Sequence, residues 1–230
     1  MVKSFLIFTT SYALLIGAFV VGCKKRPESS VQEVVKTGAE AVGSAAMATA
    51  GEAIVNQQCL PCHQKDGVGK VGLAPSISNR DFLAMASNDF IKNTIQKGRA
   101  GTAMIPRPDL TDEQVLSVIT YLRSLPNPLP VTIKVDETLK FKGDVDKGKE
   151  TFAIYCSSCH GEKGEGYASG GSGPGIGMKG FLDNASDDFI FQTVKHGRSG
   201  TSMRPFIGAK GLANLEEKDI HNVIVYLRSI

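Results

Sequence analysis

The chain of 230 residues is long enough for one large domain or two small ones. Its 42% hydrophobic residues permit a buried core, but with no tryptophan and only 7% aromatic residues a bulky prosthetic group would help to fill a small domain. The formal charge of +3, with Lys and Arg scattered along the chain, excludes the basic stripe typical of a nucleic-acid-binding protein.

The N-terminus has the pattern of an exported, lipid-anchored protein. After a short basic start, residues 5–21 are almost continuously apolar, a length at the short edge for a membrane span. Val20-Val21-Gly22-Cys23 resembles the bacterial lipobox, which predicts a signal peptide over residues 1–22 and a lipidated Cys23 on the periplasmic side of a membrane. Two or more acyl chains would give stable anchoring. The alternative is an uncleaved helical anchor with an incidental cysteine, and both interpretations export the rest of the chain.

Residues 23–50 are predicted to form a tether, flexible or partly helical, between the lipid and the first domain. Lys24, Lys25 and Arg26 directly follow the cysteine, where cations meet anionic headgroups. The rest of this segment is poor in large apolar residues and rich in Ala, Ser, Gly and Glu, a composition typical of a linker.

The remainder of the chain contains a duplication. The copies are 97 residues apart at a Cys-Cys-His element, 99 apart at a methionine and 105 apart at a final helix, so the second has gained length in loops. The matching segments are 88–104 with 187–203, and 118–125 with 223–230. They predict domains over residues 51–125 and 143–230, joined by a linker over residues 126–142 whose prolines stop a helix.

Helical patterns dominate both copies, so the predicted fold class is all-α. Val145–Tyr155 is predicted to be a helix that leads into the second Cys-Cys-His element, with Ala53–Gln58 as its counterpart. Thr111–Gln114 has the pattern of a capping box ahead of an amphipathic helix. The alternation from Val131 to Phe141 predicts an extended connector packed along a domain surface, and no sheet is predicted.

Each copy contains a Cys-x-x-Cys-His motif: Cys59, Cys62 and His63 in the first, and Cys156, Cys159 and His160 in the second. This pattern is typical of c-type haem attachment. Two residues between the cysteines let one helical turn present both sulfurs to the haem vinyl groups, and the adjacent histidine then lies under the iron as its proximal ligand. The sequence therefore predicts two haem c groups, one in each copy.

Other chemistry also uses Cys-x-x-Cys. Zinc needs four ligands, and two pairs could share one tetrahedral site, but each copy carries its own complete set. A thioredoxin-like redox site needs a βαβ setting, which the sequence lacks. Structural disulfides within the pairs would leave the two histidines unexplained. Covalent haem is the interpretation that accounts for every residue of the motif.

A methionine follows each motif in the same local sequence. Met104 lies 41 residues after the first motif's histidine and Met203 lies 43 after the second's, each within Gly-Arg-(Ala/Ser)-Gly-Thr-(Ala/Ser)-Met-x-Pro. Small residues let the backbone approach a haem face, and a thioether ligand raises the potential of the iron. Met104 and Met203 are therefore predicted to be axial ligands. The alternative, a core methionine, better suits Met85 and Met178, which do not recur.

On these residues each copy resembles a class I cytochrome c domain, and the pair is similar to dihaem class I cytochromes over residues 51–125 and 143–230. In that family a proline after the haem motif offers its carbonyl to Nδ1 of the proximal histidine, which fixes the imidazole and raises its basicity. Pro75 in Gly-Leu-Ala-Pro and Pro174 in Gly-Pro-Gly-Ile match that element. Pro174 lies two residues further from its histidine than Pro75 does.

Other recurring residues are less specific. Arg99 and Arg198 lie five residues before their methionines and are candidates to pair with haem propionates, the alternative being solvated surface arginines. Tyr121 and Tyr226 are predicted to fill a helix–helix contact rather than to line the haem crevice. The histidines outside the motifs do not recur and are predicted to be surface or packing residues: His196 and His221.

Two six-coordinate irons would leave no position for a substrate, so electron transfer rather than enzymatic catalysis is the expected function. The primary hypothesis is a membrane-tethered electron carrier of a respiratory chain, with redox-protein donor and acceptor. One alternative is a haem-carrying subunit of a larger membrane redox complex, such as an oxidase or a quinol-oxidising complex. Another is a dihaem peroxidase, which would need one haem with a displaceable distal ligand.

Overall fold

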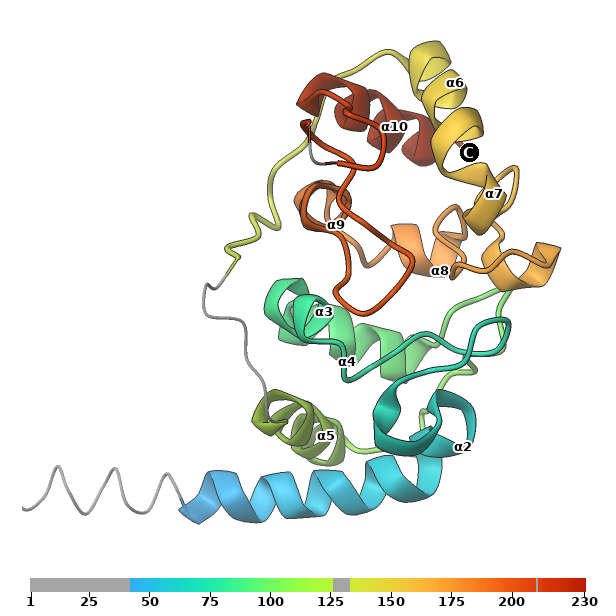
Figure 1. Ribbon diagram of the computed structural model, residues 1–230. Helices are drawn as coiled ribbons and strands as arrows, with labels where there is room; N and C mark the ends of the chain where they lie inside the picture. Colours follow the sequence, from blue (N-terminus) through green and yellow to red (C-terminus); the bar gives the residue numbers. More distant parts are fainter. Residues whose placement is uncertain (1–41, 126–132, 210) are drawn as a thin grey trace, which may run out of the picture. The chain divides into compact units, whose positions relative to one another are not determined.

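The computed structural model describes residues 42–125, 133–209 and 211–230 (Figure 1). The predicted signal peptide over residues 1–22, the lipidated Cys23 and the proline-rich start of the linker lie outside these ranges. Within them the regular structure is helical, with β-type pairing limited to two isolated bridges, Lys70–Ala74 and Ile207–Leu215. The all-α fold class is confirmed. None of the helices described is long and apolar enough to cross a membrane.

The first repeat begins with a helix that runs through both of its cysteines. Residues 42–54 are helical, the next turn widens into the π-helix η1 (Val55–Cys59), and the chain continues into α2 (Leu60–His63). The sequence predicted this helix from Ala53 and a tether before it that is flexible or partly helical, and the end of the tether is helical. The remaining elements are η2 (Lys65–Gly67), α3 (Arg80–Met85), α4 (Asn88–Lys97) and α5 (Asp112–Ser124).

The second repeat has the same order of helices. α6 has the predicted bounds, Val145–Tyr155. Equivalent serines cap equivalent helices, since the Ser87 hydroxyl accepts from Phe90 N and the Ser186 hydroxyl from Phe189 N, each at 3.0 Å. The elements after α6 are α7 (Ser157–His160), η3 (Gly166–Ser169), α8 (Lys179–Leu182), α9 (Asp187–His196) and α10 (Glu217–Ser229).

The predicted capping box begins α5. The Thr111 hydroxyl accepts from Gln114 N at 3.2 Å, and the Gln114 side chain accepts from Thr111 N at 2.8 Å. This cap fixes the start of the helix, and so fixes which face its apolar residues present to the core. The buried stripe on that face is the predicted one, Val115, Val118, Ile119 and Leu122.

In each repeat the first and last helices cross at a glycine. A Cβ atom at Gly51 would lie 1.9 Å from the carbonyl oxygen of Ser117 in α5, and one at Gly148 would lie 2.0 Å from that of Asn222 in α10. The two backbones therefore touch at these points, an approach that a side chain would block. Since each cysteine motif lies at the end of the first helix, this crossing sets its position in the repeat.

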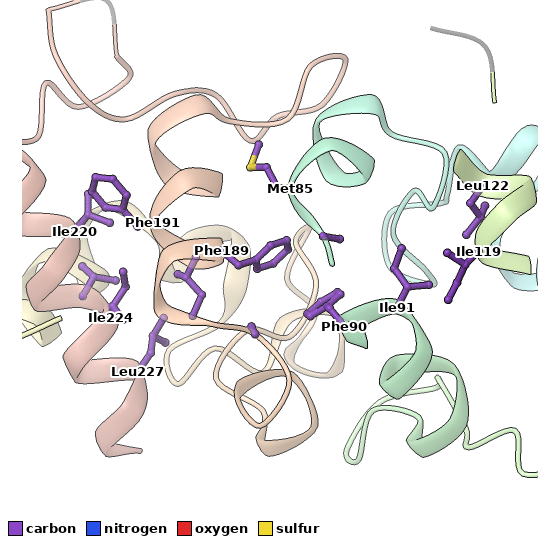
Figure 2. Close-up of a cluster of buried hydrophobic side chains, with 14 of the residues drawn as sticks. Met85, Phe90, Ile91, Ile119, Leu122, Phe189, Phe191, Ile220, Ile224 and Leu227 are labelled. Carbon is purple, nitrogen blue, oxygen red and sulfur yellow. The ribbon is translucent and has the colours of Figure 1, made fainter. Parts of the chain in front are cut away.

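One hydrophobic core extends through both repeats (Figure 2). α3 of the first repeat packs against α9 of the second, and α8 of the second packs against α4 of the first, so equivalent helices make equivalent contacts. Phe90 and Phe189 occupy the same position in the two copies, and their ring centroids lie 4.8 Å apart. Met85 is buried beside them, as predicted for a core methionine (Figure 2). The repeats are therefore packed as one body.

The described part of the linker lies on the second repeat. Asp136 N donates to the Asp188 carboxylate at 2.7 Å, and Phe141 N donates to the Asp187 carboxylate at 3.1 Å. The Phe141 ring stacks on His221 with centroids 4.1 Å apart. Residues 133–141 thus pack along a domain surface as predicted, but with a turn at Glu137 and Thr138 rather than fully extended, and His221 is a packing residue.

Candidate functional site

Both Cys-x-x-Cys-His motifs lie on a helical turn at the end of the first helix of their repeat. Cys59 ends η1, and the cysteine and histidine that follow it lie in α2. Cys156 caps α6, and Cys159 N donates to its carbonyl oxygen at 3.2 Å. Residues three apart on a helix are neighbours on its surface. Each pair of sulfurs is therefore presented on one side of its helix, as attachment to two vinyl groups requires.

Cys62 is exposed and the other three cysteines are half-buried, and the first thiol of each pair lacks the lowered pKa of a reactive thiol. All four are free of disulfides in the structure. Burial raises the pKa of the Cys59 thiol, and raises the pKa of the Cys156 thiol to about 12. Thiols of thioredoxin-like sites have a lowered pKa. Among the residues described, no three His, Cys, Asp or Glu side chains gather as a metal site, so the two pairs do not meet in a shared zinc centre.

Each histidine contacts the proline carbonyl that the resemblance indicates. His63 Nδ1 donates to Pro75 O at 2.7 Å, and His160 Nδ1 donates to Pro174 O at 2.8 Å. A carbonyl can only accept, so this bond places the proton on Nδ1 and leaves the Nε2 lone pair for a metal. Burial lowers the pKa of both imidazoles, an effect that the bond to the proline carbonyl only partly offsets. Burial therefore favours the neutral ring, the form that binds iron.

The loop that carries each methionine is closed by the same three hydrogen bonds. In the first repeat Arg99 N donates to Met104 O at 2.8 Å, the Thr102 hydroxyl donates to Arg99 O at 2.8 Å, and Met104 N donates to that hydroxyl at 3.1 Å. The same bonds in the second repeat, at 2.6, 2.8 and 3.1 Å, join Arg198, Thr201 and Met203. The methionine backbone is thus fixed by its own loop.

A glycine starts each of these loops at the end of the preceding helix. Gly98 has a φ of +64°, and a Cβ atom there would lie 2.6 Å from Met104 O. Gly197 has a φ of +70°, and a Cβ atom there would lie 2.7 Å from Met203 O. Both the positive φ and the close approach require glycine, which explains why Gly precedes Arg in the recurring sequence.

Arg99 and Arg198 lie over aromatic rings at the contact between the repeats. The Arg99 guanidinium is 5.0 Å from the ring centroids of Phe90 and Phe181, one from each repeat. The equivalent rings for Arg198 are Phe82, at 5.5 Å, and Phe189, at 5.4 Å. The alternative of solvated surface arginines is therefore wrong, because both side chains are half-buried between the two copies.

The two guanidinium groups also provide a test of whether these residues fit a haem. Each donates to a recurring threonine, Arg99 to Thr94 at 3.2 Å and Arg198 to Thr193 at 2.9 Å. Nη1 of Arg198 is buried and has no acceptor in the structure described. Burial lowers the pKa of both arginines to about 10. A buried donor beside a predicted ligand loop matches the carboxylate of a haem propionate, so the residues fit the group.

Sequence reasoning missed two recurring supports of the site. The crossing glycines Gly51 and Gly148 are 97 residues apart, the spacing of the cysteines, and could have been found from it. Arg123 and Arg228 recur in Tyr-Leu-Arg-Ser. They donate to carbonyl oxygens at the ends of α3 and α8 respectively, and so hold these helices against the last helix of each repeat.

The two recurring tyrosines lie in packing contacts or at half-buried positions, and the remaining histidine lies on the surface. Tyr226 is buried and packs against Phe152 with ring centroids 5.5 Å apart. Tyr121 is half-buried at the equivalent position, and His196 is exposed at the end of α9. The packing role expected for Tyr226 is confirmed.

The family model described as cytochrome c oxidase, cbb3-type, subunit III matches residues 46–122 and 143–227, one segment in each repeat. The chain belongs to this family. It is a tandem class I cytochrome c that carries two haem c groups.

Characterised relatives include proteins of different kinds. The cbb3-type cytochrome c oxidase subunit FixP of Azorhizobium caulinodans is 31% identical over 65% of this chain and 50% of its own length. Cytochrome c4 of Thiocapsa roseopersicina is 28% identical over 79% of this chain and 91% of its own length. A thiosulfate dehydrogenase of Psychrobacter arcticus is 26% identical over 74% of this chain and 55% of its own length. The chain thus spans about half the length of the FixP and thiosulfate dehydrogenase relatives.

Proposed function

We propose that this cytochrome passes single electrons through two haems with His/Met coordination, His63 with Met104 and His160 with Met203. The observation that carries the proposal is that both repeats contain the same complete set of supports. In each, a proline carbonyl orients a neutral imidazole, and three hydrogen bonds fix the backbone of the methionine. When bound, each haem supplies an iron that changes its oxidation state by one electron.

The protein residues have distinct roles in this proposal. Cys59, Cys62, Cys156 and Cys159 would hold the haems covalently. Pro75 and Pro174 would orient the histidines so that Nε2 is free to bind iron. Arg99 and Arg198 would balance propionate charge between their aromatic neighbours. Each group positions or desolvates a redox centre, which is what electron transfer asks of a protein.

We propose no catalytic activity for the chain itself. The histidine and the methionine proposed for each iron would together leave no coordination position for peroxide or another substrate. A dihaem peroxidase would need one methionine to leave its iron, and the closed hydrogen-bonded loop around both methionines argues against that. The relative named thiosulfate dehydrogenase makes turnover worth measuring. Peroxide or thiosulfate turnover by the purified protein would contradict this part of the proposal.

A second candidate function, a subunit of a membrane oxidase, is favoured by the family match and by the FixP relative. The discriminating experiment is purification in mild detergent with a tag on this chain. A stable, stoichiometric complex with haem–copper oxidase chains supports the subunit role. Elution as a free monomer supports the independent carrier.

We further propose that a lipid on Cys23 holds the protein at the periplasmic side of a membrane. Mass spectrometry of the purified protein is expected to find a chain that begins at an acylated Cys23. A chain that begins at Met1 with an unmodified Cys23 would contradict the lipid anchor.

The ligand assignment is tested by spectroscopy on single variants. Met104→Leu and Met203→Leu are each expected to remove about half of the methionine–iron band at the red edge of the visible spectrum, because each removes one of two such bonds. Met85→Leu is the matched control, since Met85 is a buried core residue, and it is expected to keep the whole band. Two haems per chain and an unchanged band in either ligand variant would overturn that assignment.

A further inference from the structure

The contact between the repeats is symmetric in its helices but not in its charge. The first turn of α3 meets the methionine loop of the second repeat, and the first turn of α8 meets the methionine loop of the first. Asp81 and Gly180 occupy equivalent positions in these two turns, and their neighbours Ser199 and Ala100 are equivalent as well, each pair being 99 residues apart. One side of the contact thus has a carboxylate where the other has no side chain.

The Asp81 side is held by two hydrogen bonds from α3 and its cap to one residue of the opposite loop. Ser199 N donates to the Asp81 carboxylate at 2.6 Å, and the Asn79 side chain donates to Ser199 O at 2.9 Å. Asp81 is only 5% exposed, so its charge is screened little by solvent. A charge of the first repeat is therefore buried against the methionine loop of the second.

The Gly180 side is closed by direct backbone contact. A Cβ atom at Gly180 would lie 2.7 Å from Ala100 N and 2.9 Å from Arg99 Cα. The loop of the first repeat therefore lies where any side chain at position 180 would have to be. This contact brings no charge to the loop that carries Met104.

The pKa values of the two arginines beside these contacts are set by different groups. For Arg99, burial alone lowers the pKa, whereas for Arg198 the charge of Asp81 partly opposes the effect of burial. The charge of Asp81 also raises the pKa of His196, against the larger lowering by burial. The positive charge of Arg198 is thus partly balanced from the other repeat, and Asp81 supplies no such balance to Arg99.

We propose that Asp81 lowers the reduction potential of the haem in the second repeat by placing a buried negative charge from the first repeat beside that haem's methionine loop. Reduction of a ferric haem adds one electron from an external donor, so a nearby negative charge opposes it and a positive charge favours it. The inference rests on the proposed assignment of one haem and one methionine ligand to each repeat. Asp81 would then be the residue that makes the two sites unequal at their shared contact.

The test is a spectroelectrochemical titration of the full-length dihaem protein and of Asp81→Asn. Asparagine keeps an acceptor for Ser199 N and removes the charge, so the potential of one haem is expected to rise while the other stays nearly constant. Asp89→Asn is the matched control, because it removes an exposed carboxylate from the same repeat. Asp81→Glu, which keeps the charge, is expected to titrate like the unmodified protein.

The haem that responds is identified with Met104→His and Met203→His, each of which lowers the potential of its own haem by replacing a thioether ligand. The step that rises in Asp81→Asn must be the one that falls in Met203→His. If neither histidine variant moves a step, the proposed ligand set is wrong. If both histidine variants lower the potential of one haem, the ligand set stands and the role of Asp81 can be judged. That role is wrong if Asp81→Asn shifts no potential further than Asp89→Asn does, or if it shifts both potentials equally. Asp81→Ser gives the same uncharged comparison should the asparagine variant fold poorly.

Discussion

Phe90 and Phe189, which hold the same position in the two repeats, pack on each other with ring centroids 4.8 Å apart and planes inclined by 32°. Both rings are buried, and each also lies under an arginine from a methionine loop. The centre of the contact between the repeats is therefore built from two phenylalanines at equivalent positions. Its packing and the arginines of both candidate haem sites depend on the same pair of rings.

Replacing either ring is expected to weaken the whole protein. Phe90→Ala and Phe189→Ala should each lower the free energy of unfolding by about 3–5 kcal/mol, because each leaves a cavity in a core shared by both repeats. Urea denaturation measures this loss. Ile105→Ala, at an exposed position, is the control and should change the free energy little. Losses below about 1 kcal/mol for both phenylalanines would show that the contact contributes little to the fold.

The glycine crossings predict a sharp positional effect. Gly51→Ala and Gly148→Ala would each force a methyl group into a carbonyl oxygen of the last helix, so both should destabilise the fold, by at least the 1–3 kcal/mol or so typical of overpacking. Gly43→Ala lies on the same helix as Gly51 with no atom within 4 Å of the new carbon, and should stabilise it by about 0.5–1 kcal/mol. Thermal unfolding of the three variants compares the effects. Equal changes in thermal stability for Gly43→Ala and Gly51→Ala would rule out the close crossing of the two helices.

Arg228 should contribute more to the free energy of unfolding than its counterpart Arg123 does. Arg228 donates to the Asp187 carboxylate at 2.8 Å, whereas Arg123 donates to the neutral side chain of Asn88 at 3.0 Å. Arg228→Gln leaves a buried carboxylate whose other cation, Lys140, lies 3.9 Å away on an exposed side chain. A loss of about 3–5 kcal/mol is expected for Arg228→Gln, against about 1–3 kcal/mol for Arg123→Gln. Chemical denaturation decides the order, and a larger loss for Arg123→Gln would refute this account.

The connector should be released by removing one carboxylate. Asp188→Ala loses the acceptor for Asp136 N, so residues 133–142 are expected to be cleaved faster in limited proteolysis. Asp89→Ala is the matched control, because Asp89 has the same place in α4 as Asp188 in α9 but is exposed. Mass spectrometry of the fragments locates the cuts. Unchanged cleavage in Asp188→Ala would mean that other contacts, such as the stacking of Phe141 on His221, suffice to hold the connector.

The sequence predicted those features that depend on short-range signals. The helix bounds of α6, the capping box at Thr111 and the two Cys-x-x-Cys-His turns follow from local patterns, and the structure has them. The start of the first helix was left open between a flexible and a partly helical tether, because an Ala-rich segment with few large apolar residues is compatible with both a linker and a helix. Gly51 lay inside that helix and was recognisable only by comparison with Gly148.

The surroundings of Arg99 and Arg198 could not be predicted in the same way. Their aromatic neighbours come from both repeats, and which helix of one copy meets which helix of the other depends on long-range packing that no local pattern encodes. The difference between Asp81 and Gly180 was visible in the aligned copies. The consequence of this difference could be inferred only from the structure, in which both positions contact the methionine loop of the opposite repeat.

The reciprocal packing of α3 on α9 and of α8 on α4 places the two repeats of one chain as the subunits of a twofold homodimer are placed. In a homodimer every substitution appears on both faces at once, so an acidic residue on one side of the axis brings its copy on the other. In a single chain that restriction is absent. Asp81 and Gly180 can therefore differ, and the two halves of the contact can acquire separate properties.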